Sequence, residues 1–390
     1  MELIRLGDIA SKITKGTTPT SVGYDFIARG INFVKVESIT ENREFISNKF
    51  AHISEECNEK LNRSQLKEND ILFSIAGVIG RTAIVHKDIL PANTNQALAI
   101  IRVPNGRIDY SFLAYALESP MVHKQYEKQQ QGVAQINVSL QNVGDFLIPR
   151  LELEEQRHIV ATLDKVSDLI AKHRAQLDKL DLLVKARFVE MFGDPLRNTK
   201  GWPCLELTKV CTAILGGGTP SKSHPEYFMG TVPWVSPKDM KHVIITDSID
   251  HITEEAIANS TTNLVPVNSV LMVIRSGILK HTLPVAINSV PVTINQDMKA
   301  FVPDSNMLTE FLMYYFKAIE PDVLAGVRGV TADNIDFKAF QKRKIIVPPL
   351  EVQKKYAIFV HCVDKSKLTI QQSLDKLEIL KKALMQQYFG

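Results

Sequence analysis

The segment Leu177-Asp178-Lys179-Leu180 recurs unchanged as Leu374-Asp375-Lys376-Leu377, at a separation of 197 residues. Phe192-Gly193 recurs as Phe389-Gly390 at the same separation. Chance matches would scatter in separation, so this shared spacing indicates that the chain consists of two homologous halves. A period this long exceeds that of a solenoid repeat, and it predicts two domains, each followed by a connecting segment.

Weaker matches extend the repeat toward the start of each half. At separations of 201, 200 and 199, the matched pairs are Thr18-Pro19-Thr20 with Thr219-Pro220-Ser221, Asn95-Gln96 with Asn295-Gln296, and Pro149 with Pro348. The separation drifts in one direction, as small deletions in a duplicated segment would produce. Two copies in one chain predict internal pseudo-twofold symmetry, and hence a ligand with two comparable sites.

Bulk composition is that of a globular protein with two cores. The chain has 390 residues, of which 45% are hydrophobic, and no apolar run approaches the roughly 18 residues that a membrane span needs. Its four cysteines form no C-x-x-C pair, so a zinc site is not expected. We expect a cytoplasmic protein without a membrane partner. The net charge of +3 shows no strongly basic domain, although local clusters can still contact phosphates.

Two heptad patterns predict long helices at residues 151–193 and 351–390, each ending at Phe-Gly. The first would be roughly 55–60 Å long and could hold two domains apart, and an antiparallel pair is the natural packing. The apolar positions, spaced 4, 3, 4, 3, include Ile159, Leu163, Val166, Ile170, Leu177, Leu180 and Val184 in the first helix, and Val360, Val363, Ile370, Leu374, Leu377 and Leu384 in the second.

Polar residues interrupt both heptad seams: His173 and Arg187 in one helix, and Lys367 and Lys381 in the other. Such residues can fix the register of a helix pair at a cost in stability. Alternatively, their long stems cover the seam while their charged ends reach water, and we favour this second interpretation.

The two remaining regions, residues 1–150 and 194–350, predict α/β or α+β globules. Short apolar runs bounded by turn residues predict strands at 31–36, 70–74, 98–103, 270–274 and 344–347. Helices are expected at 111–128 and 308–319. The predicted fold is therefore two similar globular domains separated by two long antiparallel coiled-coil helices in a circular, pseudo-twofold arrangement.

Motifs of catalysis are not found in this sequence. There is no phosphate-binding G-x-x-x-x-G-K-[ST] loop, no G-x-S-x-G elbow, no H-E-x-x-H, and no Asn-Pro-Pro-aromatic segment for holding a flipped base. The Gly216-Gly217-Gly218-Thr219 segment lacks the lysine of a phosphate loop. A binding protein, and not an enzyme, is the favoured interpretation.

Two related turns combine glycine, hydroxyls and lysine, which together could bond phosphate oxygens. They are Lys15-Gly16-Thr17-Thr18-Pro19-Thr20 and Gly217-Gly218-Thr219-Pro220-Ser221-Lys222. A tight turn that needs glycine for its dihedral angles is the alternative. Asn95-Gln96 and Asn295-Gln296 could read adenine edges, but because both halves keep them we favour a structural role.

Residues that read different half-sites should differ between the copies. This criterion selects Lys35 against Ser236, and loop 76–81 against loop 275–281, where cations could reach guanine or phosphate or could simply be solvated. The candidate nucleic-acid contacts are Lys15, Thr17, Thr18, Lys35, Arg81, Gly218, Thr219, Ser221, Lys222, Lys238, Arg275, Ser276, Lys280 and His281.

The exits from the two globules carry a resemblance to a known family. The segments are Ile148-Pro149-Arg150-Leu151-Glu152-Leu153-Glu154-Glu155-Gln156-Arg157-His158-Ile159-Val160 and Val347-Pro348-Pro349-Leu350-Glu351-Val352-Gln353-Lys354-Lys355. Together with the duplicated Gly-Thr turns and Asn-Gln pairs, they resemble the specificity subunit of type I restriction-modification systems over the whole chain. Glu351-Val352-Gln353 departs from the Glu-Glu-Gln of the first copy, which puts the local capping of the second helix in doubt.

The resemblance implies two target recognition domains, similar to those of adenine-N6 methyltransferases, each reading half of an interrupted double-stranded DNA site. It implies that the helices act as spacer and as docking surface for two modification subunits, to which restriction subunits add. S-adenosylmethionine, ATP and Mg would be held by those partners, with no cofactor on this chain. The rival hypothesis is a duplicated coiled-coil scaffold that binds only proteins.

Overall fold

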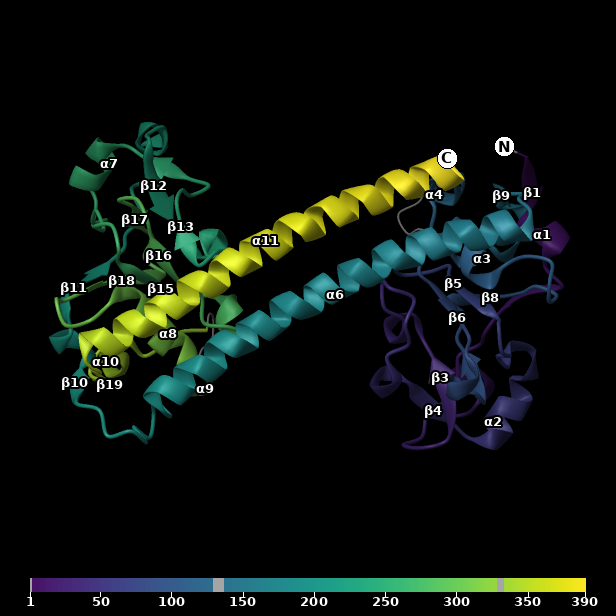
Figure 1. Ribbon diagram of the computed structural model, residues 1–390, viewed down its shortest axis with the longest axis horizontal. Helices are drawn as coiled ribbons and strands as arrows, with labels where there is room; N and C mark the ends of the chain where they lie inside the picture. The colour runs from purple at the N-terminus through teal and green to yellow at the C-terminus, as the bar shows by residue number, and fades with distance from the viewer. Residues whose placement is uncertain (1, 129–136, 328–332) are drawn as a thin grey trace. The chain divides into compact units, whose positions relative to one another are not determined.

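The computed structural model describes residues 2–128, 137–327 and 333–390, which divide into two compact units (Figure 1). Unit 1 comprises Met1–Ala175 and Gln371–Gly390, and unit 2 comprises Gln176–Ile370. Each unit therefore contains one globule and a part of both long helices. Because this division cuts through the helices, the four segments expected from the sequence (1–150, 151–193, 194–350 and 351–390) stay a prediction.

Unit 1 is built on two small sheets and a separate strand pair. Its four-stranded sheet has the order β2 (Lys12–Lys15), β8 (Leu98–Arg102), β5 (Ile71–Ser74), β6 (Thr82–Ile84), and its three-stranded sheet has the order β4 (Ala51–Ile53), β3 (Ile31–Val34), β7 (Ala92–Thr94). Strand β1 (Leu3–Arg5) pairs antiparallel with β9 (Leu147–Pro149). The helices are α1 (Leu6–Ile9), α2 (Glu55–Lys60), α3 (Tyr110–Leu117), α4 (Pro120–Lys128) and α5 (Leu140–Asp145).

Unit 2 repeats this plan. Its larger sheet has the order β11 (Cys211–Gly216), β18 (Met298–Pro303), β15 (Val270–Val273), β16 (Val285–Asn288), β13 (Ile244–Ile245), and its smaller sheet has the order β14 (His251–Ile252), β12 (Val232–Val235), β17 (Thr293–Ile294). Strand β10 (Cys204–Glu206) pairs with β19 (Lys344–Ile346). The helices are α7 (Glu254–Ala258), α8 (Thr309–Ala318), α9 (Glu320–Ala325) and α10 (Phe337–Phe340). The predicted mixed fold of two similar globules is confirmed.

The expected strands are present, with ends that differ by one or two residues, but one expected helix is wrong. The helix predicted over 111–128 is two helices, α3 and α4, separated at Glu118-Ser119. Pro120 occupies the first position of α4, where its missing N–H costs nothing, whereas inside a continuous helix it would break a hydrogen bond. The Ser119 hydroxyl accepts a hydrogen bond from the Val122 N–H (3.3 Å) and so caps the new start.

The two long helices are α6 (Leu153–Phe192) and α11 (Leu350–Phe389), as the heptad patterns predicted. In unit 1 the start of α6 and the end of α11 share the core, where Ile159 and Leu163 are buried with Phe389. The ring centroids of Phe389 and Phe112 lie 5.3 Å apart. The helix seam is thus part of the core of the globule as well as a contact between helices.

Unit 2 uses the other ends of the same two helices. Phe188 and Phe192 of α6 pack their rings against Tyr356 of α11, with centroids 5.5 and 5.4 Å apart. The Tyr356 hydroxyl donates to the backbone carbonyl of Val184 (3.2 Å). In each unit the start of one helix lies beside the end of the other, so the segments within a unit run antiparallel.

Two of the polar seam residues, Lys367 and His173, have partners on the facing helix, which sequence alone did not identify. In unit 2, Lys367 forms an ion pair with Asp181, and in unit 1 the His173 Nε2 lies 3.0 Å from the Ser373 hydroxyl. Lys381 lies near the half-buried Glu118, and burial lowers the pKa of this lysine. Burial raises the pKa of Glu118, whose carboxylate accepts a hydrogen bond from Thr82. These side chains are therefore tied to the helix pair and are not simply solvated.

The structure corrects one equivalence between the halves. The Arg150 N–H donates to the Glu2 carbonyl, and the Val347 N–H donates to the Pro203 carbonyl, so Arg150 corresponds to Val347 at a separation of 197. Pro149 then corresponds to Ile346, and the match of Pro149 with Pro348 was wrong. The mismatch arises because proline is tolerated at any extended position that donates no hydrogen bond, so its place can shift between copies.

Gln156 and Gln353, again 197 residues apart, hold the first turn of each long helix. The Gln156 side chain accepts from the Asp109 N–H and donates to the Leu151 carbonyl, both at 2.8 Å. Gln353 is fully buried, accepts from the Leu308 N–H at 2.8 Å and donates to the Pro348 carbonyl at 2.7 Å. The departure at Val352 therefore leaves the anchoring of the second helix intact.

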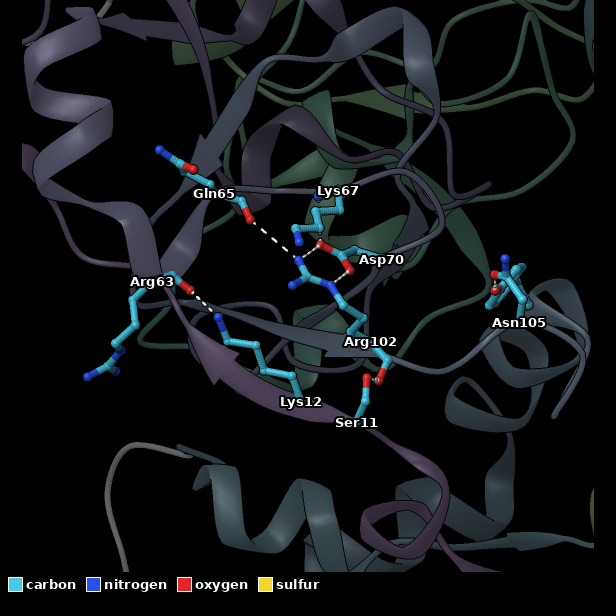
Figure 2. A network of polar contacts seen from close by, with 9 residues as sticks. Ser11, Lys12, Arg63, Gln65, Lys67, Asp70, Arg102 and Asn105 are labelled. Atoms are coloured by element: carbon cyan, nitrogen blue, oxygen red, sulfur yellow. Dashed lines mark hydrogen bonds and ion pairs between the residues drawn. The ribbon is translucent and has the colours of Figure 1, made fainter.

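One buried ion pair distinguishes the core of unit 1 from that of unit 2 (Figure 2). The guanidinium of Arg102 donates from Nε and Nη2 to the two carboxylate oxygens of Asp70, at 2.6 Å each, and the Asp70 side chain is fully buried. The Lys67 N–H adds a hydrogen bond of 2.8 Å. By strand register the equivalent residues of unit 2 are Ser269 and Val302.

Replacing Asp70 alone is expected to destabilise unit 1 strongly. An Asp70→Ser variant leaves the Arg102 guanidinium unpaired in a largely buried site, which costs about 3–5 kcal/mol. The double variant Asp70→Ser/Arg102→Val installs the residues of unit 2 and should recover much of that loss. Urea unfolding of the three proteins checks this. A double variant as unstable as the single one would contradict the assignment of the loss to the unpaired arginine.

Candidate nucleic-acid interface

Each unit places a Gly-Thr turn tightly against an Asn-Gln turn. A Cβ atom on Gly16 would lie 1.8 Å from the Thr94 carbonyl oxygen, and one on Gly217 would lie 2.0 Å from the Asn295 carbonyl oxygen. Any other residue at these two positions would clash with backbone. Glycine is therefore required here by the close approach of two chain segments and not by its dihedral angles, since neither glycine has a positive φ.

Side chains complete the contact between the turns. The Thr18 hydroxyl donates to the Gln96 side-chain oxygen at 2.5 Å, and Thr219 makes the same bond with Gln296. Asn95 accepts from the Ala97 N–H through its side-chain oxygen at 3.1 Å, and Asn295 closes an equivalent turn. These bonds support the structural role that we favoured for the Asn-Gln pairs.

The paired turns lie at the end of two parallel strands in each unit. Strand β3 pairs parallel with β7, and β12 pairs parallel with β17. Lys35 follows β3 and Ser236 follows β12, while the Asn-Gln turns follow β7 and β17. We call this region, formed by the Gly-Thr turn, the Asn-Gln turn and the residue after β3 or β12, the turn face. Ligands commonly bind outside the carboxyl ends of parallel strands.

In unit 1 the candidate contact residues lie in different environments. Lys15 is exposed, and Thr17 and Lys35 are half-buried. The Lys35 ammonium lies 4.6 Å from the centre of the Phe26 ring. Arg81 is directed to the protein itself: its Nη1 donates to the Ile39 carbonyl at 3.1 Å. Its Nε is buried without a hydrogen-bond partner among the described residues.

In unit 2 one group of candidate DNA-contact residues lies in the Gly-Thr turn and after strand β12. Gly218 is buried and its carbonyl accepts from the Trp234 indole N–H at 3.0 Å. Ser221 contacts the Ser223 hydroxyl at 2.6 Å, and the exposed Lys222 lines a cavity of about 520 Å³ with Phe228 and Trp234. Lys238 forms an ion pair with Asp250 at 2.6 Å.

A second group in unit 2 occupies the β15–β16 loop. By strand register this loop is four residues longer than the β5–β6 loop of unit 1, since Ile71 pairs with Ile84 whereas Val270 pairs with Ile287. Arg81 directly precedes Thr82 of β6, so it does not correspond to any of the residues added in the longer loop of unit 2. Ser276 begins a short 3₁₀ turn, Lys280 lies 3.8 Å from Asp333, and His281 is exposed.

Arg275 lies where this loop meets the turn face. Its Nε donates to the Asp297 carboxylate at 2.6 Å, and its side chain is 48% exposed. It lines a cavity of about 730 Å³ together with Gln296, Asn334 and Lys338. Sequence reasoning missed Asp297 and Asn334. Asp297 could have been found because it matches Ala97 at the separation of 200 that aligns the Asn-Gln pairs.

Residues 2–128, 137–327 and 333–390 contain no group of three or more His, Cys, Asp or Glu side chains that could hold a metal ion. Over the same residues, every helix is too short or too polar to cross a membrane. What the turn faces offer is hydroxyls, amides and cations, which suits binding more than catalysis.

Comparison with known proteins gives one family. A model described as the type I restriction modification DNA specificity domain matches residues 1–182 and again 199–379. The EcoR124I/EcoR124II specificity subunit of Escherichia coli is 36% identical over 225 residues, covering 56% of this chain and 53% of that protein. The MjaIX specificity subunit of Methanocaldococcus jannaschii is 28% identical over 192 residues, covering 48% and 43%. The chain spans about half the length of these curated relatives.

Solved structures show the same fold at low identity. A chain from a study of complex assembly and conformational transition in a type I R-M system matches with a TM-score of 0.63 at 19% identity, covering 99% of this chain and 97% of that one. The S subunit of a type I restriction-modification system from M. genitalium matches with a TM-score of 0.53 at 14% identity, covering 100% and 96%.

Proposed function

This chain belongs to the family of type I restriction modification DNA specificity domains, of which it carries two in tandem, and from that premise we propose that it is the DNA-recognition subunit of a type I restriction-modification complex. Each unit would read one half of an interrupted double-stranded DNA site. The chain would act in the cytoplasm, without catalytic activity of its own.

The observation that carries this proposal is the turn face, which is built twice with the same framework and with different surroundings. The Thr–Gln bond recurs in both units, whereas Lys35 is replaced by Ser236, and Ala76 and Ala97 are replaced by Arg275 and Asp297. A shared framework positions the ligand, and variable side chains next to it select the sequence. Two such faces fit a DNA site with two unlike halves.

The long helices support the proposed partners. Each unit exposes an adjacent apolar pair on a long helix: Leu182-Leu183 in unit 2 and Ile379-Leu380 in unit 1. The pairs are equivalent, because 197 residues separate them. Both lie midway between seam positions and so point away from the seam. Apolar side chains exposed at the same place in both copies suit two identical partners, which we infer to be two modification subunits.

Methyl transfer and cleavage would then depend on the partners. S-adenosylmethionine would be bound by the modification subunits, and ATP and Mg by the restriction subunits that join them. The lack of a catalytic motif in the sequence supports this division of labour. The rival hypothesis, a scaffold that binds only proteins, accounts for the exposed helix residues but not for the paired turn faces with unlike side chains.

A methyl-transfer assay tests the proposal. With tritiated S-adenosylmethionine, the purified chain is expected to add no label to DNA, whereas the chain with its modification subunit should do so. Affinity of that complex for DNA should fall steeply with salt, because phosphate contacts release counterions. Incorporation by the pure chain would contradict a non-catalytic subunit. DNA affinity of the complex that does not depend on this chain or on salt would favour the scaffold.

A further inference from the structure

We propose that Arg275 reads a guanine in the half-site bound by unit 2, at the mouth of the cavity that it lines with Gln296 and Asn334. This inference rests on the proposed function and names a specificity-determining residue within it. The ligand is the major-groove edge of one base, and the contact belongs to one half-site only.

The Arg275 side chain is fixed by an ion pair with Asp297. Its Nε donates to Asp297 Oδ1 at 2.6 Å, and Asp297 is itself fixed by Asn295, whose side-chain nitrogen lies 3.2 Å from Oδ2. The Asp297 N–H donates to the Asn295 side-chain oxygen at 3.1 Å. Because the ion pair uses Nε, the two terminal nitrogens of Arg275 have no protein partner among the described residues and are available to a ligand. A pre-organised guanidinium loses less entropy on binding.

The backbone of Arg275 is fixed as well. Its N–H donates to the Asp297 carbonyl at 3.2 Å, and it forms a β-bridge with Asn334. The main chain of Arg275 is therefore held between Asp297 and Asn334. A side chain placed by main-chain and carboxylate contacts together can present its terminal nitrogens in one direction, which is the geometry that bidentate recognition requires.

The charges around the cavity favour a base over a phosphate. Arg275 is paired with Asp297, and among the described residues the lining also contains one further cation, Lys338, and one further carboxylate, Asp336. These four charges sum to about zero, and the two carboxylates would repel a phosphate. The neutral edge of guanine offers O6 and N7 as two acceptors, which is the commonest specific target of arginine in the major groove.

Unit 1 contains the same backbone without the ion pair. The Ile75 N–H donates to the Ala97 carbonyl and the Ile274 N–H donates to the Asp297 carbonyl, both at 2.8 Å. Ala76 forms a bridge with Asn137 as Arg275 does with Asn334. Ala76 and Ala97 thus stand where Arg275 and Asp297 stand. The chain itself shows that this framework folds with two alanines, so the contact is specific to unit 2.

The test replaces the pair by the residues of unit 1. The Arg275→Ala/Asp297→Ala chain, bound to its modification subunit, is compared with the unaltered complex by base-resolution methylation mapping. Affinity for DNA duplexes carrying each base at every half-site position is measured in parallel. We expect discrimination at one guanine of the unit 2 half-site to fall roughly 5- to 150-fold, with the unit 1 half-site unchanged. Arg197→Ala, which removes one exposed cation from unit 2, should leave the pattern as it was.

Two outcomes would overturn the inference while leaving the proposed function in place. An unchanged methylation pattern and affinity would make Arg275 an ordinary surface cation. An equal loss of affinity for all sequences, with a shallower dependence on salt, would make it a phosphate contact. If the unaltered complex itself showed no two-part site, the proposed function would fail instead.

Discussion

A chain carrying Leu182→Glu and Ile379→Glu together is expected to bind no modification subunit. The two side chains are 63% and 67% exposed on the long helices, so a charge there leaves the seam and both cores untouched. Covering each apolar side chain should contribute roughly 1.5–3 kcal/mol to docking, and a carboxylate in the covered interface adds a desolvation cost. The mass of the purified complex in solution measures the number of bound subunits.

Each single variant should lose one partner and keep the other, since the two residues occupy equivalent positions in different units. Val189→Glu is the matched control, because Val189 is exposed on the same helix while its counterpart Gln386 is already polar. It should retain both subunits. A double variant that still carries two modification subunits, or a control that loses them, would place the docking surface elsewhere.

The sequence was a good guide wherever one strong local pattern decides the structure. The seam that starts at Ile159 follows a single period along the first long helix, so the extent of α6 could be predicted to within two residues. Strands such as β5 and β15 are continuous apolar runs between turns and were found in the same way. The whole-chain repeat added the two-unit organisation and the position of both turn faces.

What sequence could not predict depends on contacts between distant segments. Arg275 and Asp297 lie 22 residues apart, and nothing local indicates that they pair. Lys367 looked like an exposed seam residue because its partner, Asp181, is 186 residues away. Pro149 was matched to Pro348 because identity was the only guide before the strand hydrogen bonds were known. For the same reason sequence alone did not indicate that Arg81 donates to the Ile39 carbonyl.

Exchange of whole recognition units is the second large effect that we expect. In one chimera residues 203–347 replace residues 2–150, so that the chain carries two copies of the unit 2 globule. These ranges are equivalent because Glu2 pairs with Arg150 as Pro203 pairs with Val347. The supporting helix positions are apolar in both units, for example Leu163 and Val360. Two identical readers related by a twofold axis should recognise an interrupted palindrome.

Base-resolution methylation mapping of this chimera, of the reciprocal one and of the unaltered chain, each with the modification subunit, tests the central claim most directly. The unaltered chain should methylate a two-part site with unlike halves. The two chimeras should each methylate an interrupted palindrome, one built from the unit 2 half-site and the other from the unit 1 half-site. If a chimera that assembles normally keeps the original site, or recognises a sequence related to neither half, the units do not read DNA independently.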